Sequence, residues 1–125
     1  MFDDLLQANA QYAKNFPYRG LPGALAHGLL IVTCMDSRLD PLEIFGLKVG
    51  QAKVLRTPGG FLKPSTLAGA IAAVHKLNVD RIMVLEHTNC TMASTDEAGL
   101  RAIIAKQAGQ PVGAVSYTHL RAHET

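Results

Sequence analysis

The stretch LLIVTCMDSR (residues 29–38) decides the fold, because a continuous apolar run ends abruptly in polar and reactive residues. Short, partly β-branched runs such as residues 29–33 are typical of strands buried on both faces of a parallel sheet. A helix start follows, in which Asp40 is expected to be the N-cap and Pro41 the first helical residue. We therefore expect a buried strand that carries the CMDSR segment at its carboxyl end.

More strands and helices are predicted along the chain. Further strands are predicted at residues 53–56 and 82–85, and helices at 3–15, at 65–76, and from a capping box at 94–97 to Gly109. Strands that alternate with helices predict an α/β fold, with a central, mainly parallel sheet flanked by helices. Ligands of such sheets bind beyond the carboxyl ends of the strands, where this chain places its reactive residue types.

The composition limits the class of protein. A chain of 125 residues with 48% hydrophobic and 18% charged side chains suits one folded domain and excludes disorder. Its apolar runs are far shorter than the roughly 20 residues of a membrane span. The net charge is only +2 and the basic residues are scattered, so neither nucleic acid nor a membrane is expected as a partner. The acidic start MFDDL lacks the features of a signal peptide, so we expect a cytoplasmic protein with reduced cysteines.

Cys34, His87 and Cys90 form a soft nitrogen and sulfur donor set that suits zinc. His87 and Cys90 are three positions apart in the loop after the third strand, and Cys34 ends the first. Three protein ligands and an open fourth position are typical of catalytic zinc. Asp36 could fill that position and close the site, or it could pair with Arg38 and leave the position to water.

Each residue also has a plainer interpretation. Cysteines at strand ends are often small core residues, and Asp36 and Arg38 could form a structural ion pair at a helix entry. Gly59 and Gly60 are either turn glycines with positive φ, or positions where backbone amides approach a small anion or a carbonyl-like substrate. The combination of CxDxR after one strand with HxxC after another favours metal binding.

Two other enzyme classes fit poorly. A cysteine phosphatase needs a longer backbone cradle between its cysteine and arginine, and here Asp36 would repel an anionic substrate. No GxGxxG motif opens a helix, which argues against a dinucleotide site. A zinc-stabilised domain without activity, with Asp36 as a fixed fourth ligand, stays open as an alternative.

CMDSR (residues 34–38) and HTNC (residues 87–90) resemble the two zinc-ligand motifs of the β-class carbonic anhydrases. VLRTPGG (residues 54–60) is similar to the glycine-ending segment between those motifs, and the resemblance covers roughly residues 1–110. It implies a β-carbonic-anhydrase-like fold of the compact bacterial type. It further implies one Zn²⁺ per chain, with Cys34, His87 and Cys90 as ligands.

The resemblance also implies the reaction, which is the reversible hydration of carbon dioxide to bicarbonate and a proton. Asp36 would be the exchangeable fourth ligand or a hydrogen-bond acceptor, and Arg38 its partner. The expected assembly is a homodimer or a higher homo-oligomer, with the N-terminal helix lying on the partner subunit.

The chain departs from the family pattern at several places. It has RTPG (residues 56–59) where the family usually has RNAG, and Asn89 and Thr91 flank Cys90 where the family usually has Asp and Gly. We expect residues 1–115 to be a domain incomplete at its C-terminus, and residues 116–125 to be a non-native tail. An inactive truncated fragment is therefore a further alternative.

Overall fold

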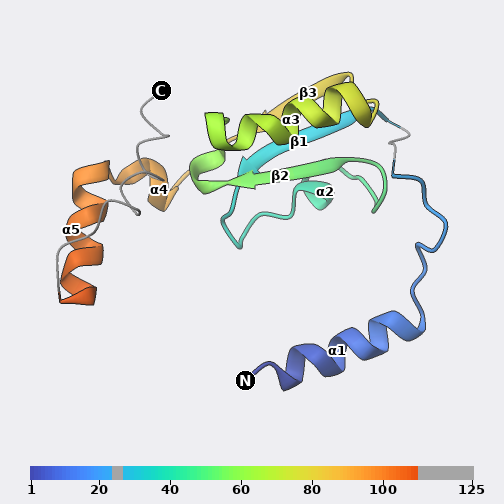
Figure 1. Cartoon of the computed structure of the whole chain (residues 1–125), viewed down its shortest axis with the longest axis horizontal. Coiled ribbons are helices and arrows are strands. Elements are labelled where there is room, and N and C mark those ends of the chain that lie inside the picture. The colour runs from blue at the N-terminus through green and yellow to red at the C-terminus, as the bar shows by residue number, and fades with distance from the viewer. Residues whose placement is uncertain (24–26, 110–125) are drawn as a thin grey trace.

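The computed structural model describes residues 1–23 and 27–109. The end of the expected domain, residues 110–115, and the expected tail at 116–125 lie outside the described residues. The elements follow one another as α1 (Asp3–Lys14), β1 (Leu29–Cys34), α2 (Pro41–Ile44), β2 (Lys53–Thr57), the 3₁₀ turn η1 (Pro58–Gly60), α3 (Pro64–Lys76), β3 (Arg81–Leu85), α4 (Thr91–Ser94) and α5 (Glu97–Ala108). Figure 1 shows their arrangement.

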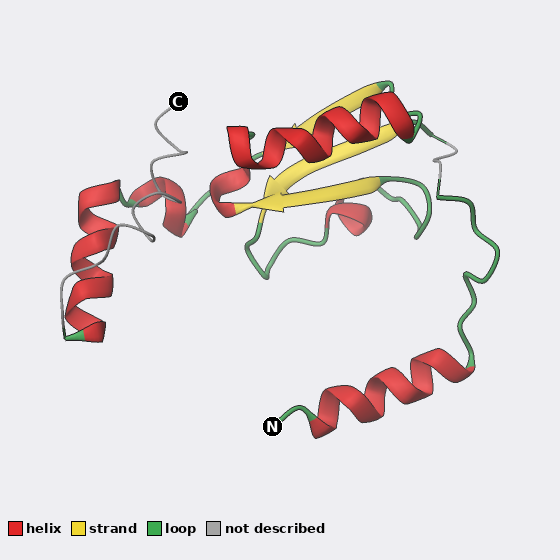
Figure 2. Cartoon of the chain, viewed as in Figure 1, coloured by secondary structure: helices red, strands yellow, loops and turns green. Residues whose placement is uncertain are grey.

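The strands of the described residues form one parallel sheet in the order β2-β1-β3, with β1 in the centre. Ile31 of β1 lies opposite Val54 of β2 on one side and Met83 of β3 on the other. Because the strands run the same way, their carboxyl ends meet at one edge of the sheet (Figure 2). The prediction of an α/β fold with a parallel sheet flanked by helices is confirmed.

The core lies on β1, which is buried on both faces as its unbroken apolar run predicts. Leu30 and Val32 pack with Ala70 and Ala73 of α3 and with Val79, which precedes β3. The small alanine side chains let the helix backbone approach the sheet closely. This packing places α3 over β1 (Figure 1).

The structure adds one detail to the predicted helices and corrects another. The larger apolar side chains of α3, namely Leu67, Ile71 and Val74, are exposed, while the alanines make the contact with the sheet. The helix that ends at Gly109 begins later than the 94–97 box predicts, because its N-cap is Asp96, whose carboxylate accepts from the Gly99 N–H at 2.7 Å. The expected cap at Asp40 is confirmed, since its side chain accepts from the backbone N–H of Glu43.

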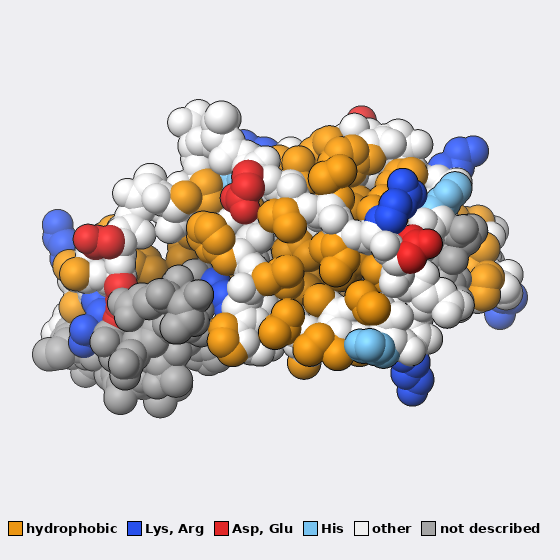
Figure 3. All heavy atoms as spheres, turned by 90° about the horizontal axis from the view of Figure 1, so that it is seen from above, with side chains coloured by type: hydrophobic (Ala, Val, Ile, Leu, Met, Phe, Trp, Pro, Cys, Tyr) orange, Lys and Arg blue, Asp and Glu red, His pale blue; other side chains and the backbone are white. Residues whose placement is uncertain are grey.

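Apolar side chains also gather on the surface. Figure 3 shows them across the face seen from above, which is the face of α3 and β3. The predicted N-terminal helix is present as α1, which has no buried residue and lies apart from the sheet (Figure 1). Among the described residues, no helix has the length and apolar character needed to cross a bilayer.

Val32 and Val84 offer a matched test of the core. They lie opposite each other in the sheet, yet Val32 is 0% exposed and Val84 is 51% exposed. Val32→Ala is expected to lower the free energy of unfolding by about 1.5–3 kcal/mol, because it removes fully buried methyl groups. Val84→Ala is expected to cost at least about 1 kcal/mol less in urea denaturation. Equal losses would show that the outer strand is as buried as the central one.

Candidate metal centre

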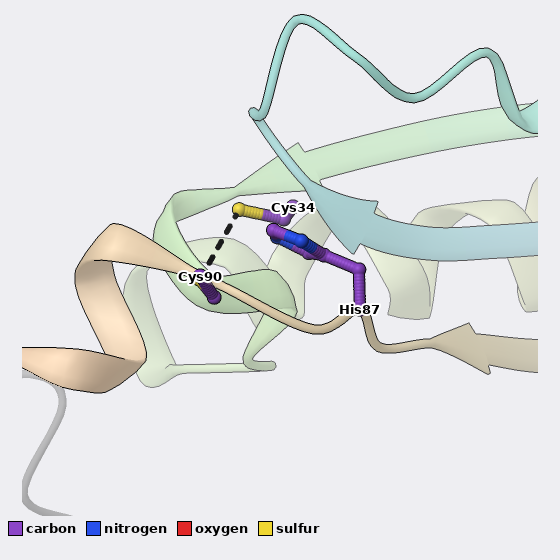
Figure 4. Close-up of side chains that lie close together, drawn as sticks. All are labelled: Cys34, His87 and Cys90. Carbon is purple, nitrogen blue, oxygen red and sulfur yellow. Dashed lines mark hydrogen bonds between the residues drawn. The ribbon is translucent and has the colours of Figure 1, made fainter.

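Cys34, His87 and Cys90 meet at the carboxyl edge of the sheet (Figure 4). Cys34 is the last residue of the central strand β1, His87 lies in the loop after β3, and Cys90 is the N-cap residue of α4. One donor atom from each lies within 4.8 Å of the others, and both cysteines are buried. The prediction that these residues converge is confirmed, and they form a group that could hold a metal ion.

The spacing and chemistry of these donors fit zinc. The two sulfur atoms lie 3.8 Å apart, and two thiolates bound to a tetrahedral zinc at about 2.3 Å are separated by about 3.8 Å. His87 Nδ1 lies 2.8 Å from the Thr88 carbonyl oxygen, a contact in which the ring nitrogen donates. His87 Nε2 is buried and has no hydrogen-bond partner in the described part of the chain, which leaves its lone pair for a metal.

The surroundings favour the ionised thiol. Burial raises the pKa of Cys34, but the His87 side chain and the backbone N–H groups of Asp36 and Gly59 outweigh it, so the net pKa is lowered. The Cys34 sulfur is in turn the main reason why the pKa of His87 is raised. Because the thiolate is the form that binds metals, this environment prepares Cys34 for coordination.

Asp36 is paired with Arg38. Arg38 Nε donates to Asp36 Oδ1 at 3.0 Å and Arg38 Nη2 donates to Oδ2 at 2.7 Å, and the Arg38 backbone N–H adds a third bond to Oδ1. These bonds hold the pKa of Asp36 well below its usual range. Asp36 Oδ2 also lies 3.9 Å from His87 Nε2, so the carboxylate is next to the donor cluster while it rests on Arg38.

The same arginine joins the two loops of the centre. Its Nη2 also donates to the Asn89 carbonyl oxygen at 3.2 Å, next to Cys90 in the sequence. Asn89 has a φ of 55°, in the left-handed region that asparagine tolerates better than most residues. Arg38 therefore couples the position of Asp36 to the backbone beside the second cysteine.

Gly59 and Gly60 are turn glycines, with φ values of 77° and 75°. A Cβ atom on Gly60 would lie 3.3 Å from the backbone nitrogen of Cys34, so the turn also packs tightly against the first ligand. On Gly59 it would meet the Phe61 ring at 2.4 Å. The turn interpretation of both glycines is confirmed, while their contact with a substrate stays a prediction.

Sequence reasoning treated residues 53–56 as a strand and missed what Arg56 does. Its guanidinium donates to backbone carbonyl oxygens of the loop that follows β1. The buried Thr33 was missed as well; its hydroxyl donates to the Leu85 carbonyl oxygen at 2.9 Å and ties the end of β1 to β3. A polar residue inside the apolar run 29–33 is the signal that could have found Thr33, whereas the exposed position of Arg56 on β2 gives no such signal.

Two of the remaining histidines lie outside the centre. His27 and His75 are both exposed. His119 and His123 lie outside the described residues.

Comparisons with known proteins agree with this geometry. The family profile described as carbonic anhydrase matches residues 29–116. Beta-carbonic anhydrase 1 of Mycobacterium tuberculosis is 36% identical over 103 residues, which are 81% of this chain and 62% of that protein. The chain thus spans less than two thirds of that relative's length.

Solved structures are similar as well. The carbonic anhydrase of Streptococcus mutans has a TM-score of 0.80 at 29% identity, covering 89% of this chain and 67% of that one. One of two structures described as tetrameric beta-carbonic anhydrases, from Sordaria macrospora, has a TM-score of 0.60 at 27% identity, covering 74% of this chain and 52% of that one.

Cys90→Ser tests the ligand set. Replacing the second thiolate is expected to lower the zinc content of the purified protein from about one per chain to near zero, because a serine hydroxyl is a poor zinc ligand. Elemental analysis measures the zinc content. The control is His75→Gln near the exposed end of α3, which removes a possible metal ligand far from the centre and leaves both cysteines in place. Full zinc retention by Cys90→Ser would mean that the ligand set is wrong.

Proposed function

This chain belongs to the β-class of the carbonic anhydrase family, and we propose that it binds one zinc ion per chain and catalyses the reversible hydration of carbon dioxide to bicarbonate and a proton. The observation that carries the proposal is the convergence of Cys34, His87 and Cys90 within 4.8 Å at the carboxyl edge of the sheet. Zinc, when bound there, would supply the Lewis acidity that makes water a nucleophile at neutral pH.

The donor charges suit an anionic product. Cys34 and Cys90 as thiolates would offset the formal charge of a divalent ion, while His87 as a neutral ligand adds none. Bicarbonate would then be held less tightly than at a site with a net positive charge, which favours its release. The lowered pKa of Cys34 supports this charge state.

Asp36 is the proposed acceptor for the attacking water. Its carboxylate lies beside His87 Nε2, and with a pKa well below the usual range it stays ionised at neutral pH. Arg38 holds both carboxylate oxygens, so it orients Asp36 and keeps the group away from the fourth metal position. In this arrangement Asp36 accepts a hydrogen bond from the water, and the proton released by the reaction passes to buffer.

We propose that Gly59 and Gly60 contact the substrate. The turn supports this role, because both residues lack a side chain and Gly60 lies against the backbone of Cys34, the first ligand. Carbon dioxide is small, so a wall of bare backbone leaves room for it close to the metal position.

We further propose a homodimer or a higher homo-oligomer that works in the cytoplasm. The exposed apolar residues of α1, which include Leu5, Leu6 and Tyr12, support an interface in which this helix lies on a partner subunit. The description of the Sordaria macrospora proteins as tetrameric points the same way. A reducing compartment suits a site that needs two free thiols.

Carbon dioxide hydration followed by stopped flow tests the activity. The attacking water must lose a proton, and a nucleophile with a pKa near 7 gives a rate about twofold higher at pH 8.5 than at pH 7. Asp36 does not set this dependence, because Arg38 holds its pKa far below both values. If the zinc-loaded protein shows no activity at either pH, the proposal that this chain is an enzyme is wrong.

Asp36→Asn separates the proposed role from the alternative of a fixed fourth ligand. If Asp36 accepts from the attacking water, the variant keeps its zinc and loses about 10²- to 10⁴-fold in kcat. The control is Glu43→Gln, which removes a carboxylate from the nearby helix α2 without touching the centre. If the unsubstituted protein is inactive and Asp36→Asn loses its zinc, the result would instead favour a zinc-stabilised domain without activity, in which Asp36 is a fixed fourth ligand.

A further inference from the structure

We propose that Arg56 is a positioning residue of the metal centre, which holds the loop after β1 in the shape that presents Cys34 and Asp36 to the metal. The inference rests on the proposed function, since it concerns how this chain prepares its own ligand loop. It does not make Arg56 a catalytic residue, because no described contact joins Arg56 to a donor atom of the cluster.

The evidence is a set of bonds from one guanidinium to one loop. Arg56 Nη1 donates to the carbonyl oxygens of Cys34 at 2.9 Å and Asp36 at 3.2 Å, and Nη2 donates to the Leu39 carbonyl oxygen at 2.7 Å. One planar group therefore gathers carbonyl groups from both ends and the middle of the segment 34–39. The first of them belongs to a residue of the donor cluster itself.

The strand register explains how Arg56 comes to lie there. Arg56 is opposite Thr33, one position before Cys34, so its long side chain reaches past the end of β1 to the loop. The neighbouring pair, Cys34 and Thr57, is fixed by the same ladder, and the Met35 N–H donates to the Thr57 carbonyl oxygen at 3.1 Å. The position of the loop is thus set by the parallel pairing of β1 with β2.

Asp36 is consequently held at two places. Arg38 binds its carboxylate, and Arg56 binds its backbone carbonyl oxygen. The ion pair with Arg38 alone fixes the side chain relative to another residue of the same loop. The bond to Arg56 ties the Asp36 backbone directly to strand β2, beside the Met35–Thr57 bond, and so helps to fix Asp36 relative to Cys34.

Arginine has the right shape for this task. Its guanidinium presents several N–H donors in a rigid plane, whereas a lysine ammonium is a single point charge. A lysine at position 56 would keep the charge but could not reach Cys34 and Leu39 at the same time. Glutamine would lose both the charge and the fork.

The test is the zinc dissociation constant of Arg56→Gln, measured on purified metal-free protein by competition with a chromophoric chelator. Outer residues that orient metal ligands typically change metal affinity by about 10- to 100-fold, so the constant is expected to rise by that factor. Arg56→Lys is expected to show a smaller rise. Circular dichroism of the metal-free variants reports, independently, the midpoint of thermal unfolding.

Arg81→Gln is the matched control. Arg81 is the first residue of β3 and also donates to one backbone carbonyl oxygen, that of His27 at 3.4 Å, but at the amino end of the sheet. If the role of Arg56 were purely structural, Arg56→Gln would lower the unfolding midpoint and leave the zinc dissociation constant of the folded protein unchanged. Arg81→Gln is therefore expected to keep the zinc dissociation constant within about twofold of the unsubstituted chain.

The outcomes are separable from those of the proposed function. If the unsubstituted chain does not retain zinc, the proposed function fails; if it does, and Arg56→Gln binds zinc as tightly as Arg81→Gln, the role of Arg56 is overturned. Should Arg56→Gln not fold, Arg56→Lys decides the matter. A rise of at least about threefold in its zinc dissociation constant supports the role, and an unchanged constant overturns it.

Discussion

The parallel pairing of β1 with both of its neighbours is the constraint on which the rest of the structure depends. It brings the loops after all three strands to one edge, so that residues more than 50 positions apart in sequence can share a site. A register shift of one residue would turn the side chain of Cys34 to the opposite face of the sheet. The hydroxyl of Thr33, bonded to the Leu85 carbonyl oxygen, supports the register at the place where it matters most.

A metal at this edge would also stabilise the fold. The buried cluster around β1 is small, and many apolar side chains of α3 and β3 are exposed among the described residues. A ligand that binds only the folded chain shifts the folding equilibrium toward it. Zinc held by Cys34, His87 and Cys90 would join the central strand to the segment after β3, adding a link that the core itself does not provide.

The sequence was sufficient for the features that depend on local pattern. The buried strand at 29–33, the cap at Asp40 and the convergence of the donor residues follow from apolar periodicity, cap chemistry and the geometry of parallel sheets. Two other features depend on how the elements pack against one another. They are the contact of α3 with the sheet through Ala70 and Ala73, and the hydrogen bonds from Arg56 to the loop after β1. Spacing along the chain carries no information about these contacts, so they could not be predicted.

Zinc K-edge X-ray absorption of the purified protein examines the proposed centre most directly, because it counts the atoms around the metal and identifies their elements. We predict two sulfur neighbours at about 2.3 Å, from Cys34 and Cys90, and two nitrogen or oxygen neighbours at about 2.0–2.1 Å, one of them from His87. A zinc shell with fewer than two sulfur atoms would contradict the ligand set and the proposed function with it.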